Sequence, residues 1–227
     1  MLPLRFFRNR TFSLANAVSL FMSFGMFGAI FLLAQYFQTV QGYSPLQSGL
    51  RFLPWTLMPI LFAPLAGAAS DKNKISANKL LGAGLALQAI GLAWIATVAT
   101  PTTPYIDLVA PFVISGIGMA HFFAPIANVV LSTVRAEEEG QASGANNAIR
   151  ELGGVFGVAI LASIFASSGG YGSGQHFIKG MTPAVYTGAA IVALGAVLAF
   201  AIGKRPSRAV ALASEQPSDL HLTEAAA

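Results

Sequence analysis

The sequence predicts an all-α, polytopic membrane protein with six transmembrane helices. Charged residues make up only 10% of the 227 residues, whereas soluble domains contain about 25%. Hydrophobic residues make up 55%, and the mean hydropathy is +0.65. The few charges are clustered, which leaves six charge-free runs at 11–50, 52–70, 80–106, 108–134, 152–178 and 180–203. Each run can hold the roughly 20 apolar residues of a membrane-crossing helix, and a buried helix of a soluble protein would explain one run but not six.

The six helices are expected, in chain order, at 12–37, 49–69, 79–99, 107–133, 144–167 and 183–202. The first lies in the longest uncharged run. The second contains Pro54, Pro59 and Pro64, which predict a bent or loosened helix because each proline removes a backbone donor. The third carries glycines, and the fourth contains Pro125, which can kink it in the same way. The fifth is rich in glycine, and the sixth ends before a basic segment.

Basic residues predict the orientation of these helices. An even number of spans places both termini on one side of the membrane, and lysine and arginine are enriched in cytoplasmic loops. On that side we expect Arg5, Arg8, Arg10, Lys72, Lys74, Lys79, Arg135, Lys204, Arg205 and Arg208. The opposite side offers only Lys179 and, just inside the second helix, Arg51. The sequence therefore predicts a multi-pass protein of the inner or plasma membrane with both termini cytoplasmic.

The chain divides into three expected regions. Residues 1–11 form a cytoplasmic N-terminal segment, and 12–203 form the six-helix transmembrane bundle. Residues 204–227 lose both hydrophobicity and periodicity, which predicts a disordered cytoplasmic tail. The glycine-rich segment 168–182 is expected to be a flexible outer loop.

Several classes of function are disfavoured by the composition. The chain has no cysteine, which excludes disulfides, thiol catalysis and thiolate metal sites. The basic residues are scattered at helix ends rather than gathered in one patch, so we expect no nucleic-acid partner. Ser173 and His176 share a loop but lack an orienting acid, which argues against a hydrolase. We expect no enzyme activity, no catalytic residue, no metal and no cofactor.

Polar residues inside the spans are the first candidates for function, because a polar group in hydrocarbon is costly unless it is paired. Asn16, Ser19 and Ser23 share one face of the first helix, where they either line a wet cavity or join helices by packing. Gln88 lies near the middle of the third helix. His121 lies in the middle of the fourth, where it either carries a proton or is a hydrogen-bonded packing residue. We take these five residues as candidate cavity or gate residues.

The fifth helix carries a further group of candidates. Asn147 and Arg150 lie close to one face, and both are candidate cavity or gate residues. Arg150, about one turn from the expected cytoplasmic end, can extend to the surface, pair with an acid or project into a cavity. The glycines predicted to serve helix packing are Gly153, Gly154 and Gly157, of which Gly153 and Gly157 form a GxxxG pair.

Several motifs together resemble the C-terminal half of a major facilitator superfamily transporter, in the fourteen-helix drug:proton antiporter (EmrB/QacA-like) branch. The resemblance covers nearly all of residues 3–203. It is carried by FFRNRTF at 6–12, QTVQGYSPLQSG at 38–49 followed by Leu53 and Pro54, the stretch from Gly67 to Lys74, and GQASG at 140–144 with the pattern of the fifth helix.

The stretch from Gly67 to Lys74 is similar to the signature loop G-x-x-x-D-R/K-x-G-R/K of that superfamily. Gly67, Asp71, Lys72 and Lys74 can be placed on it, although Asn73 stands where the pattern has glycine. The resemblance implies that these residues form a latch that holds the inner gate closed. The missing glycine predicts a less tight turn and a weaker latch.

The resemblance also implies what the chain does. A major facilitator fold has two six-helix halves, each a 3+3 inverted repeat, with the substrate bound between them. This chain would supply one half, with the bilayer, a small-molecule substrate and a missing N-terminal transporter half as partners. The implied function is proton-coupled export of amphipathic small molecules or drugs. The alternative is a truncated, non-transporting membrane protein that associates with other helical bundles.

Overall fold

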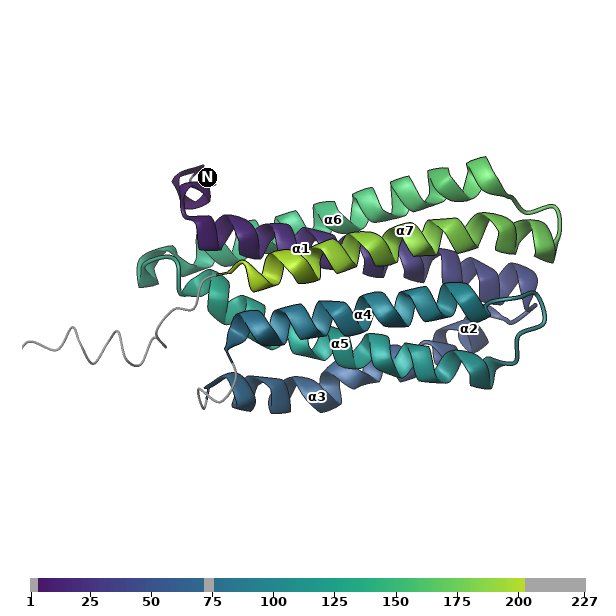
Figure 1. Cartoon of the computed structure of the whole chain (residues 1–227), viewed down its shortest axis with the longest axis horizontal. Helices are drawn as coiled ribbons and strands as arrows, with labels where there is room; N and C mark the ends of the chain where they lie inside the picture. The colour runs from purple at the N-terminus through teal and green to yellow at the C-terminus, as the bar shows by residue number, and fades with distance from the viewer. Residues whose placement is uncertain (1–3, 72–75, 203–227) are drawn as a thin grey trace, which may run out of the picture.

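The computed structural model describes residues 4–71 and 76–202, with side chains at all of these positions except 63–71 and 124. Long helices run side by side along the long axis of the molecule (Figure 1). No strand occurs in the described ranges, so the predicted all-α class is confirmed. The expected tail at 204–227 lies outside the described residues.

Seven α-helices and three shorter helical segments follow one another in the described residues. The α-helices are α1 (Arg10–Gln35), α2 (Pro45–Arg51), α3 (Leu53–Asp71), α4 (Ala77–Val98), α5 (Tyr105–Leu131), α6 (Glu139–Ser168) and α7 (Gly174–Phe200). The 3-10 helices are η1 (Leu4–Arg8) and η3 (Ala136–Glu138), and the π-helix η2 (Tyr36–Val40) continues α1.

Within residues 4–71 and 76–202, five helical segments are long and apolar enough to cross a membrane. They are Arg10–Val40, Ala77–Val98, Tyr105–Leu131, Ala136–Ser168 and Gly174–Phe200, and they confirm five of the six expected spans. The remaining span, expected at 49–69, is divided at Phe52 into α2 and α3. With 19 residues α3 measures about 28 Å, close to the thickness of the hydrocarbon core, and its Leu53–Phe62 part is apolar.

Local sequence determines where several helices begin. The Asn9 side chain accepts hydrogen bonds from the backbone N–H of Thr11 (3.0 Å) and Phe12 (3.4 Å), which caps α1. At α2, Ser44 and Gln47 form a reciprocal capping box, and Pro45 takes the first helical position, where a missing N–H costs nothing. These caps supply partners for backbone donors that the helix itself leaves unpaired.

The expected flexible loop at 168–182 is wrong from Gly174 onward, because α7 begins there, whereas residues 169–173 do connect α6 to α7 without helix. The Ser173 side chain accepts a hydrogen bond from the backbone N–H of His176 and so caps α7 nine residues before the expected start at 183. Phe177 and Met181 are buried and anchor this first part of the helix. Hydropathy did not predict this part of the helix because its exposed side chains, Gln175, His176 and Lys179, are polar. Polar side chains do not prevent helix formation.

Most of the large helix contacts keep one pattern when α1, α3 and α4 are exchanged with α5, α6 and α7, respectively. Thus α1 packs extensively against α6, and its counterpart α5 against α3. Likewise α4 packs against α5, and its counterpart α7 against α1, while α4 and α7 pack against each other. The exception is that α6 packs against α7, while their counterparts α3 and α4 barely touch. Because α1 and α5 are the first and fourth crossings, they run in opposite directions. The two helix triplets therefore form the expected 3+3 inverted repeat.

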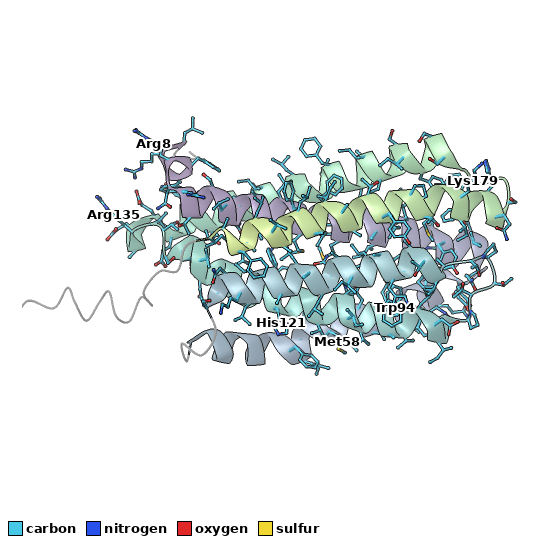
Figure 2. All side chains as sticks on the ribbon, viewed as in Figure 1. Arg8, Met58, Trp94, His121, Arg135 and Lys179 are labelled. Carbon is cyan, nitrogen blue, oxygen red and sulfur yellow. The ribbon has the colours of Figure 1, made fainter. Side chains whose placement is uncertain are left out.

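The two ends of the bundle carry different charges. Arg8 and Arg135 lie at one end, which we call the basic end, and Lys179 lies at the other (Figure 2). At the basic end, Arg5 of η1 forms an ion pair with Glu138 of η3, which ties the start of the chain to the α5–α6 connection. The predicted orientation in the membrane depends on this unequal distribution of basic residues. That the basic end faces the cytoplasm stays a prediction.

Candidate functional site

Polar side chains within the spans gather in three places. One lies between α1 and α6, a second between α4 and α5, and a third at the Lys179 end, where η2, α2 and the α4–α5 connection meet. The described residues do not form one polar cavity in which all the sequence candidates meet.

The α1–α6 cluster contains Asn16 and Ser19 from α1 and Asn146 from α6. The Asn146 Nδ2 group donates to Asn16 Oδ1 (3.0 Å) and to Ser19 Oγ (2.9 Å). Asn16 Nδ2 donates to the carbonyl of Phe12 (2.8 Å), and Ser19 Oγ to that of Ala15 (3.0 Å). All three side chains are at most 9% exposed. The cluster thus joins two helices inside the bundle, and a role in a cavity or gate stays a prediction.

Ser23 lies on the same face of α1 as Asn16 and Ser19 but forms no hydrogen bond with them or with Asn146. Its side chain is fully buried, and its hydroxyl has no hydrogen-bond partner in the described part of the chain. The expected shared face of Asn16, Ser19 and Ser23 therefore lies inside the protein.

Asn146 is a site residue that the sequence argument missed in favour of its neighbour Asn147. The two differ by about 100° around the helix, so only one can face α1. Asn146 lies seven residues before Gly153, which is about two helical turns, and both are buried. Asn147 is exposed. The seven-residue spacing between Asn146 and Gly153 was the feature of the sequence that could have identified Asn146 as the residue facing α1.

Glycines allow α1 and α6 to touch along their backbones. A Cβ atom at Gly153 would lie 2.4 Å from the carbonyl oxygen of Leu20, and one at Gly157 would lie 2.1 Å from that of Phe24. The contact partners advance by four residues on both helices, so α1 and α6 run parallel. Gly154 lies beside them, against the Phe27 ring, where a Cβ would be 2.8 Å from Cδ2. No larger side chain fits at Gly153 or Gly157 without moving a helix, whereas one at Gly154 would have to displace the Phe27 ring.

Arg150 lies further into its helix than expected. We expected it about one turn from the helix end, but α6 begins at Glu139, which places Arg150 about three turns from the start. Its Nη2 group donates to Asn147 Oδ1 (2.8 Å), and its Cζ atom lies 5.3 Å from the Phe123 ring centroid of α5. The guanidinium thus turns towards α5 and is half-buried. Its candidacy as a cavity or gate residue stays a prediction.

Gln88 and His121 lie on the two helices of the α4–α5 interface. Gln88 is fully buried in the middle of α4. His121 is half-buried on α5, with Nδ1 2.8 Å from the carbonyl oxygen of Ile117 one turn earlier. Figure 2 shows His121 near the middle of the bundle. The structure brings these two candidates to one interface, away from Asn16 and Ser19.

At the Lys179 end of the bundle, a hydrogen-bond network joins η2 and the residue after it to the α4–α5 connection. Tyr36 is buried, and its hydroxyl donates to the carbonyl of Thr100 (2.7 Å). Gln41 Nε2 donates to the Tyr36 hydroxyl (2.8 Å) and to the carbonyl of Pro101 (3.0 Å). The buried Thr103 hydroxyl donates to the carbonyl of Val98 (2.7 Å). Backbone carbonyls left open by the end of α4 thereby gain partners.

Arg51 lies between two tyrosines in the same region. Its Cζ atom is 3.4 Å from the ring centroid of Tyr43 and 5.3 Å from that of Tyr105. The Tyr105 hydroxyl donates to the Arg51 carbonyl (3.0 Å), and Arg51 Nη1 donates to the carbonyl of Gln47 (3.0 Å). The sequence argument assigned Arg51 only a topological role. We call Arg51, Tyr43 and Tyr105 the aromatic clamp, because they join the end of α2 to the start of α5.

Replacement of Arg51 by methionine is expected to lower the free energy of unfolding by about 1 kcal/mol, because the cation–π attraction is lost while most of the side-chain volume remains. The chain has no cysteine, so a single thiol placed at the buried Ser48 of α2 by Ser48→Cys reports on this end alone. We expect faster labelling of that thiol when Arg51→Met is added. Arg51→Lys keeps the charge and serves as the matched control. Equal labelling rates in all three proteins would contradict a clamp.

Two groups of side chains bear on possible metal or hydrolase chemistry among the described residues. No group of three or more His, Cys, Asp or Glu able to hold a metal ion occurs among them. A shallow surface hollow at the start of α7 is lined by Ser173, His176 and Lys179, among others. There the Ser173 hydroxyl accepts a backbone N–H as a helix cap and forms no hydrogen bond to the imidazole.

The predicted signature-loop latch lies mostly outside the described residues. Gly67 and Asp71 belong to the helical backbone of α3, but their side chains are not described. Lys72 and Lys74 lie in the gap between the two described ranges. The latch therefore stays a prediction.

Several known proteins align with most of this chain. The chain is 30% identical over 167 residues to the "Multidrug resistance protein Stp" of Mycobacterium tuberculosis, and 31% identical to the "Tetracenomycin C resistance and export protein" of Streptomyces glaucescens. It is 30% identical to the "Riboflavin transporter RibZ" of Clostridioides difficile. Each alignment covers 74% of this chain but only 30%, 30% and 36% of the relative, respectively. The chain thus spans about a third of the length of these relatives.

A family model covers most of the chain. The model for the Major Facilitator Superfamily matches residues 17–224, which include every helix from α3 to α7 and most of α1. Membership of this family is consistent with the inverted repeat of three helices and with the export function for which relatives such as the tetracenomycin C protein are named. The chain belongs to the Major Facilitator Superfamily and is similar to the C-terminal half of its drug-antiporter branch.

Proposed function

We propose that the chain is the C-terminal half of an exporter that moves amphipathic small molecules out of the cell, across the plasma membrane, in exchange for protons. Membership of a transporter family supports transport rather than catalysis. Two of the relatives are named for multidrug resistance and for tetracenomycin C export, which supports the direction and the substrate class.

The observation that carries this proposal is the inverted arrangement of the two helix triplets. In transporters built from such repeats, a substrate site near the middle of the membrane opens alternately to the two sides when helix groups rock against each other. The backbone contacts of Gly153 and Gly157 with α1 and the hydrogen bonds of Asn146 hold the two triplets together, so this half would rock as one unit. The packing is compatible with a moving half of a transporter.

A second six-helix half is part of the proposal. The relatives contain about three times the length that aligns here, which leaves room for a second bundle. We propose that the half-buried Arg150 and the exposed Asn147 face that bundle, because Arg150 already turns towards α5 instead of the α1–α6 contact. By the positive-inside rule the basic end would face the cytoplasm.

Proton coupling is proposed to use His121. It is the only Asp, Glu, Lys, Arg or His side chain on α4 or α5 that lies away from a helix end, within the described residues. Its Nδ1 atom is engaged by the Ile117 carbonyl, while Nε2 has no hydrogen-bond partner in the part of the chain that the structure describes. A half-buried imidazole with one open nitrogen can take up and release a proton.

Transport can be tested in bacteria that lack their own efflux pumps. The chain is expressed alone and together with the part of Stp that lies outside the aligned region, and export of fluorescent amphipathic dyes is measured with and without a pH gradient. We expect gradient-dependent export only when both parts are present. If no dye in a broad panel is exported, the transport proposal fails. Crosslinking of the chain to unrelated bundles would then favour the non-transporting alternative.

Replacement of His121 by alanine is expected to flatten the pH dependence of that export, because the only proposed proton carrier is removed. His121→Gln retains a hydrogen-bonding side chain but cannot carry charge, so it should behave like alanine if protonation matters. Protein abundance in the membrane is measured in parallel. An unchanged pH profile in both variants would leave His121 as a packing residue.

A further inference from the structure

The middle of the α4–α5 interface brings two helix backbones into contact. A Cβ atom at Gly84 would lie 2.7 Å from the carbonyl oxygen of Gly118, and one at Gly118 would lie 2.4 Å from that of Gly84. About two turns further along α4, a Cβ at Gly91 would lie 2.8 Å from the carbonyl oxygen of Pro111. Such close contact excludes lipid and bulk water from the space between the helices.

Gln88 lies within this contact and is fully buried. Its backbone N is 2.7 Å from the position that a Cβ at Gly118 would take, which places Gln88 directly against α5. Neither Nε2 nor Oε1 of its amide has a hydrogen-bond partner among the described residues. In contrast, the buried amides of Asn16 and Asn146 are both bonded to protein groups.

Ser115 lies on α5 one turn from Gly118 and is also fully buried. Its Oγ atom is 2.1 Å from the position of a Cβ at Gly91, so it faces α4 within one turn of Gln88. This hydroxyl likewise has no partner within the described ranges. Three buried polar atoms on the two helices of this interface therefore lack protein partners among the described residues, two from Gln88 and one from Ser115.

No described protein group pairs with any of these three atoms. A serine hydroxyl in a helix can donate to a carbonyl of its own helix. The Gln88 Oε1 atom needs a donor, and the N–H groups in the interior of α4 and α5 are already engaged in helical hydrogen bonds, so the donors left to it are the Ser115 hydroxyl and water. An unsatisfied amide in a buried membrane site costs several kcal/mol.

We propose that Gln88 and Ser115 form an internal water site between α4 and α5. A water molecule both donates and accepts, so it can serve Oε1, Nε2 and the Ser115 hydroxyl, which matches the two to four partners of typical buried water. The glycines hold the helices close on either side and keep this site separate from the α1–α6 cluster. The proposal does not depend on transport.

Solid-state NMR of the full chain in lipid bilayers tests this site. The chain is labelled with ¹⁵N-glutamine, and the side-chain signal of Gln88 is assigned by its loss in Gln88→Met or, if that variant does not fold, in Gln88→Glu. We expect magnetisation to pass from water to the Gln88 amide although its protons exchange slowly with bulk water. In Ser115→Ala we expect loss of that transfer, whereas the control Ser19→Ala should leave it unchanged.

Three outcomes would overturn the proposal. A slowly exchanging Gln88 amide without transfer from water would show that the interface is dry and that Gln88 bonds directly to protein. Fast exchange with bulk water would show that Gln88 lines an open cavity instead of an enclosed site. Transfer that persists unchanged in Ser115→Ala would remove Ser115 from the site.

Discussion

Alanine at Gly157 is expected to lower the free energy of unfolding by about 3 kcal/mol. The added Cβ would lie 2.1 Å from the carbonyl oxygen of Phe24 and 2.8 Å from its carbonyl carbon and Cα. All three atoms belong to the backbone, so no side-chain rotation can relieve the clash, and α1 and α6 must separate. The measurement is the free energy of unfolding in bilayers or mixed micelles.

Gly144→Ala is the matched control on the same helix. Nothing lies within 4 Å of a Cβ at Gly144, so this substitution should be neutral or slightly stabilising, because alanine is a better helix former than glycine by about 1 kcal/mol. Equal effects of the two substitutions would show that α1 and α6 are not in backbone contact.

Replacement of Asn146 by alanine is expected to cost about 1 to 2 kcal/mol, because two interhelical hydrogen bonds are lost and Asn16 Oδ1 is left unpaired. We expect a cost of this size because Asn146 Nδ2 forms hydrogen bonds of 3.0 Å to Asn16 and 2.9 Å to Ser19, and both partners are buried. We expect a lower midpoint of thermal unfolding for the purified protein in lipid nanodiscs.

Asn147→Ala is the matched control for Asn146, because the adjacent side chain is exposed and bonds only to Arg150. We expect little loss of stability. In a double-mutant cycle, Asn146→Ala and Asn16→Ala should be coupled, because they remove the two ends of one hydrogen bond. Additive effects would contradict an Asn16–Asn146 bond within the membrane.

Charge-free runs predicted the membrane-crossing segments because the bilayer imposes length and apolarity directly on the sequence. They did not predict the helix ends. Residues 139–143 and 174–182 contain polar side chains, yet α6 and α7 include them. A helix satisfies its own backbone whatever its exposed side chains are, so hydropathy marks where lipid begins and does not mark where the helix begins.

The candidate site was predictable only in part. The sequence identified Asn16 and Ser19 but selected Asn147 over Asn146, because a single helical position decides which side chain meets α1. The aromatic clamp could not be predicted, because Tyr105 lies far along the chain from Arg51 and meets it only through the packing of α5 beside α2 and α3. Contacts between distant segments depend on helix placement, which a single sequence does not contain.

The inverted repeat has a consequence for biogenesis. The most extensive contacts of α1 are with α6 and α7, and those of α3 are with α5, while contacts between α1, α3 and α4 themselves are few. Helices that enter the membrane first therefore cannot reach their native neighbours until the later ones emerge from the ribosome. Until α6 arrives, Asn16 and Ser19 have no access to Asn146. The earlier helices of this bundle therefore spend an interval of synthesis in the membrane without their native partners.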